Sequence, residues 1–477
     1  MAKIKYTFII IVCLLGLHVQ AQTLANAKEL YQQGDYEKAK PAFKKYVKSQ
    51  SGNGNYHLWY GVCCLHTNEP QLAVKHLEIA VKKRTPSGKL FLGQAYHQTY
   101  QFEEAIKVYE DYLTELSRRK RPTKEAEQLL AQSKLGARLL KGVEQVCFID
   151  SFVVDKSTFL KTYKISPESG KLYTYDEYFG NAPEASGTVY ETELGNKLYY
   201  AELQADSTIS ILSSNKMQEE WSKGHLLPGA INEAVNANYP YVMTDGITIY
   251  YAADGPESIG GYDIFVTRYN TTNDSYLTPQ NMGMPFNSMA NDYMYVIDEF
   301  NNLGWFASDR NQPEGKVCIY VFIPNTSKQV YNYEQLDKKK LRQLAMLHAL
   351  QDTWSDTVAV SDAKQRLSDA QLIQPAVKQK HKFEFVIDDW HIYHQLSDFR
   401  SPAAKELFNS YRQQRKSFQQ QKSKLEELRT NYMQASQANK QRLAPAILDL
   451  EKHIEQMAKE YKQTAIQIRL LEKKSTN

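Results

Sequence analysis

The sequence predicts a multidomain α and β protein. We expect a helical repeat solenoid, a β-propeller-like all-β domain and a C-terminal antiparallel coiled-coil hairpin. Three observations predict these parts: small residues recur at the period of helical hairpins, turn-and-strand units recur in the middle, and apolar residues follow a heptad pattern at the end. The length of 477 residues exceeds one ordinary core and also favours about three domains.

The first 21 residues have the features of a secretory signal peptide. Lys3 and Lys5 form a basic start, an apolar run covers residues 8–17, and small residues precede the predicted cleavage after Ala21. The apolar run is too short for a permanent membrane-spanning helix. We therefore expect an exported protein.

Residues 22–141 are predicted to form the helical solenoid. Ala39, Ala73 and Ala105 recur at separations of 34 and 32 residues, and each is followed four positions later by a large residue. Twelve positions before them stand the small residues Ala27, Gly61 and Gly93. The pattern resembles the tetratricopeptide repeat, in which small residues lie where two helices cross. The resemblance implies a surface for protein partners, and a helix over 125–140 is expected to cap the last repeat.

Residues 142–325 are predicted to form the all-β domain. Asp245-Gly246 is a strong hairpin signal, because glycine accepts a positive φ at little cost. Apolar residues alternate over 247–252 and 262–267, which predicts two half-buried antiparallel strands.

A weaker copy of this unit covers 291–324, and we align Asn291-Asp292-Tyr293 with Asn238-Tyr239-Pro240. Fainter copies occur at 166–173 and 195–200. Repeats of this kind predict about four propeller blades.

The segment Pro240–Phe265 carries the pattern P-x-x-x-x-D-G-x-x-I-Y-Y-A-A followed by G-G-Y-D-I-F. It resembles the WD40-like repeat of TolB-type propellers. The resemblance implies that Asp245 belongs to a turn and that Asp263 takes the position at which blade repeats use a carboxylate to hold a loop.

Residues 326–396 are predicted to be a helical linker, in which 382–392 could add a closing strand pair to the β domain. Residues 397–477 are predicted to form the coiled-coil hairpin. Ala404, Tyr411 and Phe418 begin a series at seven-residue intervals, and apolar residues from Leu443 onward alternate in steps of four and three. The short polar link between the helices favours an antiparallel hairpin.

Four cysteines remain after the predicted cleavage, and they do not form a disulfide framework. Cys63 and Cys64 are adjacent on a predicted helix. Cys147 and Cys318 lie in short β-runs at the two ends of the β region, so they would approach if the first and last blades paired. Two alternatives remain for Cys147 and Cys318: a disulfide between them, or two buried thiols.

We find no catalytic motif in the sequence and predict no catalytic, cofactor-binding or metal-binding residues. His391 and His394 near Asp388 and Asp389 could bind a metal, but a lone pair without a third placed ligand favours a solvated pair of histidines. Turn and loop positions are favoured over calcium ligands for Asp245, Asp254 and Asp263. A packing role is favoured over a binding face for Trp305 and Trp390.

The charge balance argues against nucleic acid, because 56 basic residues face 54 acidic ones after signal removal. The order of signal, tetratricopeptide repeats and propeller resembles the front part of the PorE-type component of the type IX secretion apparatus. That family continues into an OmpA-like domain, and here a coiled coil follows instead. The resemblance implies a non-catalytic cell-envelope scaffold that is periplasmic or associated with the outer membrane. It would bind protein partners and reach the outer membrane through one of them. The alternative is a propeller-based hydrolase or carbohydrate-binding protein. The oligomeric state stays open.

Overall fold

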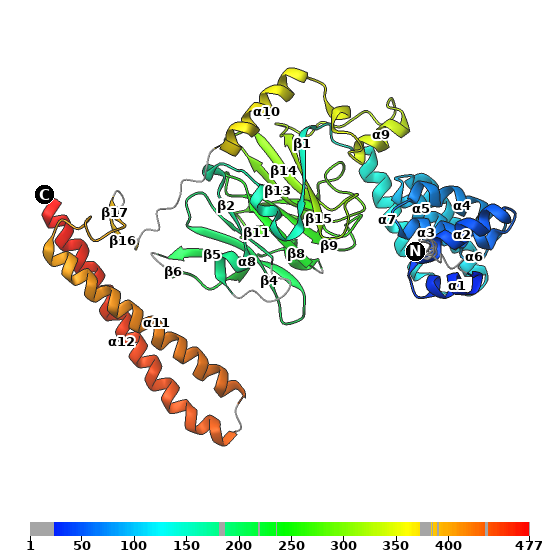
Figure 1. The fold of residues 1–477 in the computed structure, drawn as a ribbon. Coiled ribbons are helices and arrows are strands. Elements are labelled where there is room, and N and C mark those ends of the chain that lie inside the picture. Colours follow the sequence, from blue (N-terminus) through cyan, green and yellow to red (C-terminus); the bar gives the residue numbers. More distant parts are fainter. Residues whose placement is uncertain are drawn as a thin grey trace, which may run out of the picture. The chain divides into compact units, whose positions relative to one another are not determined.

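A computed structural model describes residues 23–180, 187–217, 220–234, 236–372, 383, 385–388, 391–434 and 437–476. The chain divides into two compact units after Leu372, and each is described by itself (Figure 1). The predicted signal peptide lies outside the described residues. None of the helices within the described ranges is long and apolar enough to cross a membrane.

The first unit begins with three helical hairpins and a further helix. They are α1 (Leu24–Gln32) with α2 (Tyr36–Ser49), α3 (Gly54–His66) with α4 (Pro70–Lys82), α5 (Gly88–Gln98) with α6 (Phe102–Arg118), and α7 (Lys124–Lys141). The helices cross closely: a Cβ on Gly61 would lie 2.7 Å from Leu77 Cγ, and one on Gly93 would lie 2.4 Å from Tyr109 Cε1. Only glycine fits these crossings without displacing a buried side chain.

The middle of the chain forms two sheets. Their strands are β1 (Cys147–Asp155), β2 (Lys171–Thr174), β3 (Thr188–Glu191), β4 (Lys197–Leu203), β5 (Ile209–Met217), β6 (Glu220–Trp221), β7 (His225–Leu226), β8 (Asn236–Val242), β9 (Thr248–Asp254), β10 (Asp263–Asn270), β11 (Ser275–Tyr276), β12 (Gln280–Asn281), β13 (Asp292–Asp298), β14 (Leu303–Ser308) and β15 (Lys316–Ile323). One sheet has the order β1-β15-β14-β13, and the larger one runs β11-β10-β9-β8-β5-β4-β3-β2.

The larger sheet consists of two antiparallel runs, because a single parallel pairing between Ile209 and Asn236 joins β5 to β8. Within the described ranges, the main strands thus form three four-stranded antiparallel sets, compared with the four units that the sequence predicted. β9 and β10 pair antiparallel, as the alternation of apolar residues predicted.

The two ends of the β region meet, because β1 pairs antiparallel with β15. Cys147 lies opposite Ile323 and Cys318 lies opposite Val153, so the two cysteines sit at different positions of the ladder. Both are free thiols, which removes the disulfide alternative. The predicted closing strands behave differently: β16 (Phe385–Asp388) and β17 (His391–Tyr393) pair with each other in a small sheet of their own.

The segment after the sheets packs back on β1. α9 (Lys338–Ala345) is followed by the 3-10 turn η4 (Leu350–Thr353) and by α10 (Thr357–Leu372), which lies beside the sheet in Figure 1. The Trp354 indole N–H donates to Phe148 O at 2.7 Å. Short helical pieces complete the unit: η1 (Lys156–Thr162), η2 (Pro167–Ser169), α8 (Tyr175–Phe179) and η3 (Ala230–Glu233).

The second unit is an antiparallel pair of long helices, α11 (Pro402–Gln434) and α12 (Gln437–Thr476), with β16 and β17 at one end. Ser401 N–H, before α11, donates to Glu472 near the end of α12 at 2.9 Å. Arg429 near the end of α11 pairs with Glu451 in the first half of α12 at 2.7 Å, so the two helices run in opposite directions. The predicted seam residues Ala404, Tyr411 and Phe418 are buried.

Candidate functional site

A repeated pair of side chains positions the loops of the β region. Asn236 N–H and Nδ2 donate to the two oxygens of Asp254, both at 2.8 Å. Asn291 makes the same two bonds to Asp309, at 2.8 and 2.9 Å. Each pair spans 18 residues, and the two asparagines stand 55 positions apart. We conclude that Asn236 is the counterpart of Asn291 and that the predicted alignment with Asn238 is two residues out of register.

A second asparagine in each repeat binds the backbone of the strand next to the Asn–Asp pair, which we call the clamp. The side chain of Asn232 bonds both the N–H and the C=O of Ile211, and Asn287 bonds both groups of Ile264 in the same way. The asparagine oxygens satisfy the two N–H groups, and the amide nitrogens add a second donor to carbonyls that also accept from the backbone N–H of Leu227 and Met282.

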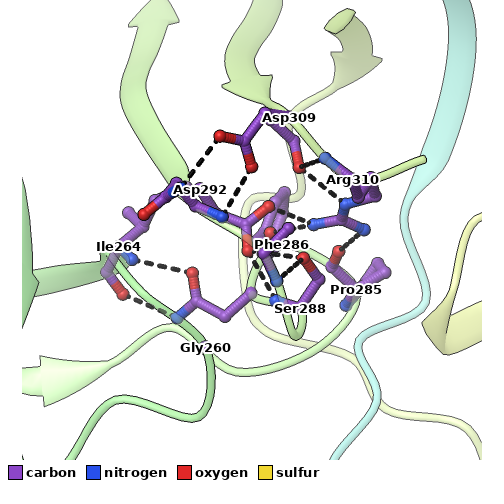
Figure 2. A network of polar contacts seen from close by, with 12 residues as sticks. Gly260, Ile264, Pro285, Phe286, Ser288, Asp292, Asp309 and Arg310 are labelled. Atoms are coloured by element: carbon purple, nitrogen blue, oxygen red, sulfur yellow. Dashed lines mark hydrogen bonds and ion pairs between the residues drawn. The ribbon is translucent and has the colours of Figure 1, made fainter. Parts of the chain in front are cut away.

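A buried ion pair then fixes the loop that follows β12 (Figure 2). Arg310 pairs with Asp292 at 2.6 Å, and their side chains are 4% and 0% exposed. The guanidinium also donates to Pro285 O at 2.8 Å and to Phe286 O. Asp292 accepts from Ser288 N–H at 2.6 Å. Nearly every polar group of the pair is therefore satisfied, and the backbone of 285–292 is held in place.

The solenoid is docked on this part of the β region. Phe102 and Leu140 of the helices form one buried cluster with Ile259, Met284 and residues of α9. At the edge, Lys338 pairs with Glu103 at 2.8 Å, and Tyr333 donates to the same carboxylate at 2.9 Å.

His97 of α5 lies inside this joint. Its Nδ1 is 3.0 Å from Ser133 Oγ of α7, and the imidazole also bonds the backbone of Ile259. Burial lowers the pKa of His97 to about 4, so the ring is neutral at physiological pH.

The joint leaves an open cleft of about 430 Å³ between the solenoid and the β region. One wall comes from the ends of α3 and α5 and the start of α4, and the other comes from the loop that the Asp292–Arg310 pair holds. The lining residues are Leu65, His66, Asn68, Pro70, Gln71, Gln98, Tyr100, Ser288, Met289, Ala290, Arg310, Asn311 and Met346.

The chemistry of the cleft suits a peptide. Four side-chain amides, from Asn68, Gln71, Gln98 and Asn311, can donate to and accept from a backbone. Met289 and Met346 add adaptable apolar surface. The described lining residues include no carboxylate, and the Arg310 guanidinium is already engaged by Asp292. The cleft therefore offers hydrogen bonds and apolar contact on a fixed frame.

The structure places the predicted repeat anchors as follows. Ala39, Ala73 and Ala105 are fully buried where the helices cross. Asp245 accepts from Ile247 N–H and Thr248 N–H at 2.9 and 2.8 Å, and Gly246 next to it has a φ of +70°. None of these residues lines the cleft.

Asp263 is completely buried and accepts from Ile259 N–H at 3.0 Å and Asn281 Nδ2 at 2.7 Å. Burial raises the pKa of Asp263 to about 7. The carboxylate thus holds the loop that leads into β10, next to the solenoid joint at Ile259.

The remaining metal-ligand and tryptophan candidates do not come together in a site within the described residues. Among the described residues, no group of three or more His, Cys, Asp or Glu side chains could hold a metal ion, and Asp389 lies outside those residues. Trp305 is completely buried in β14 and lies 5.7 Å from the ring of Tyr163, centroid to centroid. Trp390 also lies outside the described residues.

Sequence reasoning missed the cleft residues. They come from five separate stretches of chain and share no motif. The detectable signal was the repeated Asn–Asp spacing of 18 residues, which would have located the clamped loops of the β region.

Residues 24–88 match the family model of the tetratricopeptide repeat. This segment includes α1 to α4 and the start of α5, so the helical part of the prediction is confirmed there. No curated protein and no solved structure matches the chain. The tetratricopeptide repeat is a protein-interaction module, which bears directly on the cleft that its helices line.

Proposed function

We propose that this protein is a non-catalytic scaffold that binds an extended segment of a partner protein in the cleft between solenoid and β region. The observation that carries the proposal is the amide-rich wall formed by tetratricopeptide helices opposite a loop fixed by the buried Asp292–Arg310 pair. A fixed receptor surface loses little entropy on binding, which favours affinity.

We further propose that the scaffold works in the cell envelope, after export directed by residues 1–21, and that it reaches the outer membrane through a partner. Its β region acts as a propeller-like platform of the WD40-like type. Support comes from the three antiparallel four-stranded sets and from the pairing of β1 with β15, which joins the first and last strands as propellers do. The likeness to PorE-type envelope components supports the same setting.

The test is a cross-linking pull-down from envelope fractions with the mature chain. In the cleft variant, Gln71→Trp and Gln98→Trp fill the space from the solenoid wall, where both glutamines are exposed. We expect at least a tenfold loss of the captured partner, because two indole rings occupy the volume that a peptide needs.

The matched control carries Gln32→Trp and Gln128→Trp, which are exposed on solenoid helices outside the cleft. It should capture the partner like the wild type. Equal capture by both variants, with equal thermal midpoints, would contradict the cleft as the binding site. A wild-type chain that captures no protein would contradict the scaffold function.

A further inference from the structure

The second unit contains a small cavity, open to solvent, beside the start of its helical hairpin. It has a volume of about 200 Å³. Phe383, Phe408 and Tyr411 provide its aromatic surface, and Arg412, Arg415 and Lys416 add positive charge, with Gln419 beside them. These α11 positions follow a spacing of three and four residues, so they share one face of the helix.

The aromatic surface is fixed by packing at the base of the hairpin. Phe408 is 1% exposed, and its ring lies 4.4 Å from Phe383 and 5.0 Å from Phe385, between centroids. The guanidinium of Arg412 lies 5.8 Å from the Phe383 ring. Arginine can stack on an aromatic ring while it binds a carboxylate through its free edge.

The stretch of α11 that lines this cavity carries positive charge only. From Leu407 to Leu425, α11 carries five Lys and Arg residues and no Asp or Glu. Arg412 and Lys416 therefore have no carboxylate within one helical turn of α11 on either side. Basic side chains in this arrangement complement an acidic ligand.

We propose that this cavity binds an acidic segment of a partner protein that inserts one aromatic or aliphatic side chain. The volume lies below the roughly 300–1,000 Å³ of small-molecule sites, so it fits a single inserted side chain better than a cofactor. Flanking carboxylates then bond Arg412 and Lys416. Such a buried anchor with charged neighbours is the usual centre of a protein interface. The site lies in the second unit and is independent of the cleft in the first.

The test uses a fluorescein-labelled peptide with two aspartates on each side of one phenylalanine, and fluorescence anisotropy with the mature full-length chain. We expect binding that weakens with salt, because charge pairs at an exposed rim are screened. The variant Arg412→Glu with Lys416→Glu should lower the affinity at least tenfold. The control Lys422→Glu with Lys424→Glu makes the same charge change on exposed positions of α11 outside the cavity and should lower it by less than about threefold.

A peptide with alanine in place of phenylalanine should bind at least tenfold more weakly, because its anchor is missing. The cleft variant Gln71→Trp with Gln98→Trp should bind the labelled peptide normally, which separates this proposal from the proposed function. Equal losses in the two charge-reversal variants, or equal binding of the alanine peptide, would overturn it. So would binding of the chain to phosphatidylserine vesicles without binding to the peptide, or self-association that Arg412→Glu with Lys416→Glu abolishes.

Discussion

Arg310 and Asp292 form a nearly solvent-free ion pair whose partners are mostly backbone carbonyl and N–H groups. Such a pair contributes little net stability compared with two apolar residues, because both charges lose their hydration. Removal of one partner lowers the stability strongly, since the other charge then stays buried without compensation. The pair therefore serves mainly to fix the conformation of the loop that forms one wall of the cleft.

We expect Asp292→Ala to lower the free energy of unfolding of the first unit by about 3–5 kcal/mol, because Arg310 keeps its buried charge. The measurement is urea unfolding followed by tryptophan fluorescence. Asp155→Asn is the control: its pair with Lys316 is exposed, with side chains 65% and 43% accessible, and should change stability by about 0–1 kcal/mol. A loss below about 1 kcal/mol for Asp292→Ala would contradict the role of the pair.

The role of a single residue can be predicted from the sequence only where its partners are close in the chain. Asp245 and Gly246 belong to one turn, and the dipeptide alone predicts that turn. Besides the nearby Ser308 hydroxyl, the partners of the Arg310 guanidinium lie 18 to 25 residues away, so no local pattern identifies them. The bonds of Asn236 and Asn291 escaped prediction for the same reason, since each asparagine binds an aspartate 18 residues away and resembles any loop asparagine in the sequence.

At the scale of elements, the hairpin of the second unit is closed by one buried carboxylate. Glu472 of α12 is completely buried and accepts from Arg400 N–H at 3.1 Å, Ser401 N–H at 2.9 Å and the Tyr393 hydroxyl at 2.9 Å. It thus satisfies backbone N–H groups just before the first turn of α11 and carries negative charge there. The heptad pattern predicted both helices, but it gave no indication of this link between their ends.

We expect Glu472→Gln to destabilise the second unit by about 1.5–3 kcal/mol, because a neutral amide replaces a charged acceptor and adds a buried donor. The measurement is the thermal unfolding of helix signal by circular dichroism. Glu455→Gln, on an exposed face of the same helix, should leave the thermal unfolding curve unchanged, because its ion pair with Lys459 is screened by solvent. Similar melting of the two variants would show that the ends of the hairpin are held by the apolar seam alone.

At the scale of the whole molecule, the solenoid and the β region share one buried joint, and a neutral histidine lies within it. The pKa of His97 is lowered by burial to about 4, from an ordinary value of 6.5. The unfolded chain therefore binds a proton between these pH values and the folded chain does not. Stability rises with pH over this interval and is constant above it.

We expect the first unit to lose about 2 kcal/mol of stability through His97 on going from pH 7.5 to pH 5. His97→Gln, which keeps hydrogen-bonding groups, should show a correspondingly smaller loss in urea unfolding at the two pH values. His76, whose pKa is also lowered by burial to about 4, remains in the variant and accounts for part of the residual dependence. The exposed His225→Gln should retain the full wild-type dependence. An unchanged pH dependence in His97→Gln would contradict this assignment.

The pairing of β1 with β15 has a consequence for the order in which the chain folds. The helical hairpins depend on neighbours close in sequence, so each can form soon after its residues become available to fold. β1 emerges directly after them but must wait for Lys316–Ile323 before its ladder exists. During that delay its edge is open to wrong partners. A chain truncated before β15 should therefore have a native solenoid and a β region that aggregates. Pairing of the last strand is then the step that completes the folding of the first unit.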